Sequence, residues 1–129
     1  MLEERIQREL DLLKPRFTVE YVEEGRWVRI GAYPLAPGWN RTNTDVAFQI
    51  PVGYPATPPY GIYVPIGITF NSQIPKNYTE PASNHPPFVG TWGIFSWQEE
   101  QWRSADDITS GSNMMTWVLG FTERFEEGQ

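Results

Sequence analysis

The chain has 129 residues, of which 40% are hydrophobic and 15% aromatic, enough apolar material for a single packed domain over residues 1–129. Its formal net charge of -6 argues against a nucleic acid as the main partner, because binding to phosphates depends on clustered Lys and Arg. The chain has no cysteine, which excludes disulfides, thiolate metal sites and thioester chemistry within it.

The sequence contains no candidate membrane span. No uninterrupted apolar run approaches the roughly 18 residues that a spanning helix needs, and the amino terminus mixes acidic and basic side chains. We therefore expect a soluble, cytoplasmic protein that has no membrane partner. We also expect no cofactor and no metal, since the lone histidine, His85, has no His-x-x-His or carboxylate cluster beside it.

The first predicted element is an amphipathic helix over residues 2–13. Apolar residues recur there at steps of four, four and three, which places them on one helix face. Lys14-Pro15 ends the pattern, because proline cannot continue a helix. The residues of this face are Leu2, Ile6, Leu10 and Leu13.

Four antiparallel strands are expected next. Apolar and polar residues alternate over 17–21, a turn follows at 23–25, and 27–30 is rich in strand-forming residues, so these segments predict a hairpin. Alternation over 45–50 predicts a third strand with one buried face, and 62–64 predicts a short fourth strand.

The rest of the chain is expected to be irregular until a second helix. Nine of the twelve prolines lie between Pro51 and Pro87, where they remove backbone donors, so side-chain packing must hold this segment. Apolar residues at steps of three and four from Met114 to Phe125 predict a helix, with Ser112 or Asn113 as its cap. This order of elements belongs to the α+β class.

Four motifs resemble those of ubiquitin-conjugating domains. They are the Tyr-Pro-x-x-Pro-Pro turn at 54–59, His85-Pro86, Gly93-Ile94, and the Trp, Ala and Ile of 102–108. The stretch 33–45 resembles more specifically the bacterial branch called prokaryotic ubiquitin-conjugating family E. The resemblance implies a UBC-like fold with an N-terminal helix, a four-stranded antiparallel meander, a long Pro-rich irregular segment and a C-terminal helix.

The resemblance also implies a function in a bacterial ubiquitin-like modification pathway. The partners would be a ubiquitin-like protein and its activating enzyme. The cysteine of the family falls in the window 94–96, where this chain has Phe95, and Pro87 replaces the asparagine whose amide would stabilise an oxyanion. Two hypotheses follow: a transferase that receives or positions the carboxyl terminus of the ubiquitin-like protein, and an inactive module, similar to RWD domains, that binds this protein or the activating enzyme.

Three polar residues are candidates for chemistry alongside position 95. Ser96 is the only hydroxyl of the window and would accept the carboxyl terminus as an oxyester if a base took its proton. His85 is the only histidine, but the family counterpart is a structural turn residue. Asp107, with Asp106, is a candidate for contacting an incoming amine. The alternative for each is a structural or solvated surface residue.

A third hypothesis comes from the tryptophans and acids of the same region. Trp92, Trp97 and Trp102 recur at five-residue spacing, as in a platform that stacks carbohydrate or bases. Glu99 and Glu100 would then be read as acid-base groups. The alternative is that the rings pack a long loop on the sheet and the acids form a solvated rim. Aromatic rings exposed in the Pro-rich segment could pair two chains, so we expect either a monomer or a weak homodimer.

Overall fold

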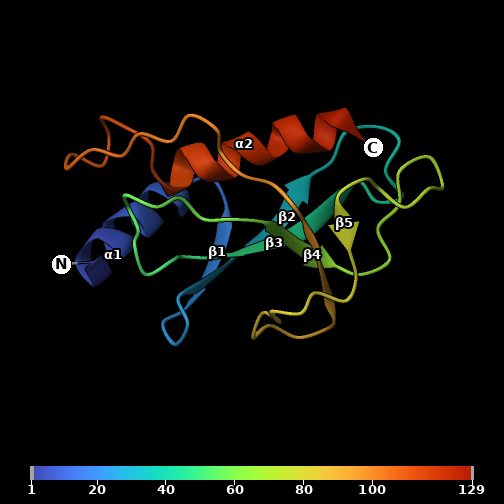
Figure 1. Cartoon of the computed structure of the whole chain (residues 1–129), viewed down its shortest axis with the longest axis horizontal. Coiled ribbons are helices and arrows are strands. Elements are labelled where there is room, and N and C mark those ends of the chain that lie inside the picture. Colours follow the sequence, from blue (N-terminus) through green and yellow to red (C-terminus); the bar gives the residue numbers. More distant parts are fainter. Residues whose placement is uncertain (1, 129) are drawn as a thin grey trace.

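The computed structural model describes residues 2–128, which form two helices and one six-stranded antiparallel sheet. Figure 1 shows α2 lying along one side of the sheet, with α1 beside its first turn. The strand order is β1-β2-β3-β4-β6-β5, so β1 and β5 form the two edges of an open sheet. The helices are α1 (Leu2–Leu13) and α2 (Met114–Glu127), and the strands are β1 (Thr18–Val22), β2 (Trp27–Pro34), β3 (Asn43–Gln49), β4 (Ile62–Pro65), β5 (Tyr78–Thr79) and β6 (Trp92–Phe95).

The α+β class describes this arrangement, but the expectation of a UBC-like fold built on a four-stranded meander is wrong. Strand β6 pairs with β4 on one side and with β5 on the other, which extends the sheet to six strands. The prolines of 51–87 do not make the whole segment irregular, because β4 and β5 use stretches that keep their backbone donors. Pro65 stands only at the last position of β4, where a missing N–H costs little.

Both helices were predicted with nearly their observed bounds. On α1, Ile6, Leu10 and Leu13 are buried, as the apolar spacing predicted. Asn113 caps α2: its side chain accepts a hydrogen bond from the Thr116 backbone N–H at 2.9 Å, and its own N–H donates to the Thr116 hydroxyl at 2.9 Å. This reciprocal pair satisfies two donors that a helix start leaves free.

The sheet carries a hydrophobic cluster on each face. The helices cover the larger cluster, which includes Trp117 and Phe121 of α2 together with Phe48 of β3. The second cluster lies under the connection between β5 and β6, residues 80–91. Its buried members are Trp27, Ala47, Tyr63, Ala82, Phe88 and Trp92.

A buried carboxylate joins α1, the Pro-rich turn and α2. Glu9 is fully buried and accepts hydrogen bonds from Arg5 Nε at 2.6 Å, from the Tyr54 hydroxyl at 2.5 Å and from the Met114 backbone N–H at 2.6 Å. The last bond places a negative charge at the start of α2, where the helix dipole favours it. Tyr54, part of a motif that supported the family resemblance, therefore has a structural role here.

Neither of the helices found within residues 2–128 has the length and apolar character that crossing a membrane requires.

Candidate functional site

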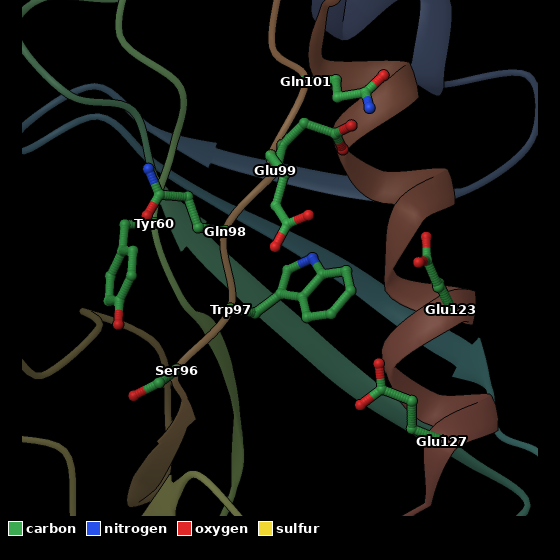
Figure 2. Close-up of a pocket in the computed structure, with 9 residues that line it drawn as sticks. Tyr60, Ser96, Trp97, Gln98, Glu99, Gln101, Glu123 and Glu127 are labelled. Carbon is green, nitrogen blue, oxygen red and sulfur yellow. The ribbon is translucent and has the colours of Figure 1, made fainter.

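A trough of about 800 Å³ lies between the segment that follows β6 and the second half of α2. Figure 2 shows the Trp97 ring projecting from that segment toward α2, with the carboxylates of Glu99, Glu123 and Glu127 around it. We call this feature the acidic trough, and it is lined by Tyr60, Ser96, Trp97, Gln98, Glu99, Glu100, Gln101, Glu123 and Glu127.

Local structure explains why the trough stays open. The segment 96–101 is anchored where it leaves the sheet: the Ser96 N–H donates to the Asn77 carbonyl at 2.7 Å, and the Trp97 carbonyl accepts from the Gly61 N–H at 2.8 Å. Beyond this anchor, the backbone N–H groups of Gln98 and Glu99 have no hydrogen-bond partner within residues 2–128. The segment that borders the trough therefore keeps backbone donors that no described residue uses.

The trough carries an unbalanced negative charge. Glu123 and Glu127 lie four residues apart, so they face the same side of α2, and Glu99 and Glu100 lie across from them. None of these four carboxylates forms an ion pair with a described residue. Like charges gathered in a concave surface create a field that attracts a cation, so the trough favours a positively charged ligand.

Ser96 lies at the rim of this trough, with an exposed side chain. The preceding residue is different in kind: Phe95 is fully buried and its ring lies 4.8 Å from the Tyr78 ring and 5.9 Å from those of Trp39 and Phe125. Position 95 is thus a core position that offers no reactive group to a ligand.

The structure does not bring His85 to Ser96. His85 is exposed in the connection that precedes β6, next to Asn84, which donates to the Gln49 side-chain oxygen at 2.9 Å, and no hydrogen bond joins His85 to Ser96 within residues 2–128. The His85 Nδ1 atom is 2.9 Å from the Pro86 carbonyl oxygen, a local turn contact. Ser96 therefore lacks the histidine base that a nucleophilic serine needs.

Asp107 belongs to a third region. Its carboxylate is exposed and accepts hydrogen bonds from the Thr109 N–H at 2.9 Å and the Thr109 hydroxyl at 2.8 Å. These bonds hold the pKa of Asp107 below its usual value, with a smaller contribution from Arg8 of α1. Asp106 lines a separate hollow with α1, so neither aspartate is in the trough.

The three tryptophans do not form a common platform. Trp92 is only 2% exposed in the second cluster, and the half-buried Trp102 donates its indole N–H to the Pro55 carbonyl at 2.7 Å. Only Trp97 lines the trough. The sequence analysis did not identify Tyr60, Glu123 and Glu127. The four-residue step between the two glutamates indicates a shared helix face, but no local pattern predicts which segment lies beside that face.

No group of three or more His, Asp or Glu side chains in the described part of the chain is placed to hold a metal ion. A comparison of the chain with protein-family models, curated proteins and solved structures gave no match. The functional proposal therefore depends on the acidic trough and its surroundings.

Proposed function

We propose that this chain binds the carboxyl-terminal tail of a ubiquitin-like protein non-covalently in the acidic trough, as a positioning component of a cytoplasmic bacterial ubiquitin-like modification pathway. The activating enzyme of that pathway would be its second partner. The observation that supports this most is the trough itself: an open, acidic hollow bordered by a segment with free backbone donors.

The shape and chemistry of the trough fit an extended tail better than a compact ligand. The irregular stretch 96–99 spans roughly 13 Å before a turn begins at residue 100, which matches about four residues of a partner strand. One of the two N–H groups of Gln98 and Glu99 can donate to a partner strand, because successive N–H groups of an extended segment point to opposite sides. The four glutamates select cationic side chains on that tail, and Trp97 offers an aromatic face to one of them.

A non-covalent role is favoured because the residues proposed for chemistry are not joined to one another. Ser96 has no hydrogen bond to His85, which makes only a local contact with Pro86, and Asp107 caps a turn near α1. The second candidate function, transfer through a Ser96 oxyester, depends on the exposure of the Ser96 hydroxyl at the rim of the trough.

The binding test compares a ubiquitin-like protein that has its tail with one lacking its last six residues, using tryptophan fluorescence and calorimetry. We expect the intact protein to bind at least about tenfold more tightly, a difference of about 1.4 kcal/mol. The double variant Glu123→Lys and Glu127→Lys should lose this binding. Glu126→Lys is the matched control, since Glu126 is exposed on the same helix but does not line the trough.

A second assay separates the two functions. With activating enzyme and ATP present, the proposed role predicts no hydroxylamine-sensitive adduct, and Ser96→Ala should bind the tail as well as the wild-type chain does. An adduct that disappears in Ser96→Ala would establish the transferase function instead. Equal binding of intact and truncated ubiquitin-like protein would refute tail binding in either form.

A further inference from the structure

Arg124 is a buried cation beside the acidic trough. It lies on α2 between Glu123 and Glu127, yet only 2% of the residue is exposed. Its Nη2 atom donates to the Lys76 carbonyl at 2.8 Å, and its guanidinium carbon lies 4.6 Å from the centre of the Phe95 ring. The side chain is therefore held between α2, the end of β6 and the segment before β5.

The hydrogen bonding of Arg124 is incomplete. Its Nη1 atom is buried and has no partner among residues 2–128, and no described carboxylate forms an ion pair with it. Burial lowers the pKa of Arg124, and the charge of Glu127 partly opposes this effect. An unpaired buried charge is costly, and a native fold that keeps one calls for an explanation.

Arg124 lies next to one end of the trough but is not among the residues that line it. Phe95, which it covers, directly precedes Ser96, and the Ser96 N–H is bonded to Asn77, the residue after Lys76. The segment that accepts the Arg124 hydrogen bond is at the surface, since Ile74 is 77% exposed and Lys76 is also exposed. A single hydrogen bond, to Lys76, links Arg124 to this segment.

We infer that Arg124 is the receptor for the terminal carboxylate of the bound tail. The planar fork of a guanidinium matches a carboxylate through two parallel hydrogen bonds. The incoming carboxylate takes the place of the Lys76 carbonyl at Nη2 and supplies the missing partner of Nη1. The inference rests on the proposed tail binding and adds a direction to it: cationic side chains lie along the glutamates, and the tail ends at Ser96.

The test uses two synthetic hexapeptides of the same cationic sequence, one with a free carboxyl terminus and one amidated. We expect the wild-type chain to bind the free acid about tenfold more tightly than the amide, although the trough is acidic. Arg124→Met should bind both peptides with equal affinity. Arg103→Met is the matched control and should keep the preference, because Arg103 is exposed and does not line the trough.

If Arg124→Met does not fold, a direct measurement on the wild-type chain tests the same inference. In the wild-type chain, the NMR signal of the Arg124 side-chain N–H should shift with the free acid and not with the amide. Equal binding of both peptides by the wild-type chain would overturn the carboxylate receptor and leave tail binding intact. Binding of neither peptide would overturn both proposals.

Discussion

Glu9 concentrates three structural roles in one buried side chain. It pairs with Arg5, accepts the Tyr54 hydroxyl and accepts the first backbone N–H of α2. A carboxylate without exposure is tolerated because its oxygens are bonded to a cation, a hydroxyl and a helix start. Its removal leaves the Arg5 charge partly buried and uncompensated.

We expect Glu9→Gln to reduce the free energy of unfolding by about 3 kcal/mol, the usual cost of breaking a buried ion pair from one side. Urea denaturation followed by circular dichroism measures this loss. Glu4→Gln is the matched control, since Glu4 is exposed on the same helix and its change should cost less than about 0.5 kcal/mol. Equal losses in the two variants would contradict a special role for Glu9.

Tyr21 makes the stability of the chain sensitive to alkaline pH. Burial and the neighbouring carboxylate of Glu3, to which its hydroxyl donates, raise the pKa of Tyr21 to about 12. The phenol of an unfolded chain ionises near pH 10. The folded state therefore gains stability from Tyr21 that is complete below pH 10 and is lost as the pH rises through about 12.

We accordingly expect the free energy of unfolding to fall above pH 10, and to fall less steeply in Tyr21→Phe than in the wild-type chain. Guanidinium denaturation at a series of pH values from neutral to alkaline checks the slope. Parallel curves for the two chains would show that Tyr21 does not contribute to this pH dependence.

At the scale of elements, the start of α2 depends on Asn113. Its side-chain oxygen accepts from Thr116, and its amide donates to the Ile108 carbonyl at 2.5 Å. Asn113→Ala should cost about 1 kcal/mol or more in unfolding free energy, because a cap and a buried acceptor lose their partners. Asn113→Asp keeps the bond from Thr116 but sets a carboxylate oxygen against the Ile108 carbonyl, so it should also be less stable than wild type. A thermal-unfolding series in which Asn113→Ala is as stable as wild type would contradict this assignment.

The connection between β5 and β6 offers a paired test of the second cluster. Phe88 is 8% exposed and its ring lies 6.1 Å from that of Trp92, whereas its neighbour Val89 is fully exposed. Phe88→Ala should cost about 3 kcal/mol, and Val89→Ala should be close to neutral. Urea denaturation gives the difference, and acrylamide quenching should increase in Phe88→Ala as Trp92 loses its cover.

At the scale of the whole molecule, the net charge of -6 and the four trough carboxylates predict salt-sensitive binding. The Debye length falls from about 10 Å at 0.1 M to about 3 Å at 1 M salt. The affinity for a cationic tail should therefore fall over this range, with a shallower dependence in the double variant Glu123→Gln and Glu127→Gln. Calorimetry at several salt concentrations measures both slopes, and identical slopes would argue against binding in the trough.

Local sequence patterns predicted the two helices, whereas the full strand order of the sheet depends on tertiary pairing that these patterns do not show. The apolar steps of α1 and the cap at Asn113 are properties of a few neighbouring residues, so the sequence carries them fully. Strand β6 is short, and it pairs with β4 and β5, which are both distant in the chain. No local sequence pattern therefore predicted it. This is why the four-stranded UBC-like expectation was wrong.

The candidate site divides in the same way. Ser96 was found because it stands in a motif, and its role stays a prediction. The glutamates of α2 and the unpaired guanidinium of Arg124 can be recognised as site residues only once the position of α2 beside the segment after β6 is known. Motif order alone related His85 and Asp107 to Ser96, and neither forms a hydrogen bond with Ser96 within the described residues.

The path of α2 has a practical consequence for handling the protein. The helix ends at Glu127, a wall of the trough, and Figure 1 shows the carboxyl end on the opposite side of the molecule from the amino end of α1. An affinity tag or surface attachment placed after α2 would crowd the opening and compete with any visiting peptide. Immobilisation through the amino end leaves that opening clear.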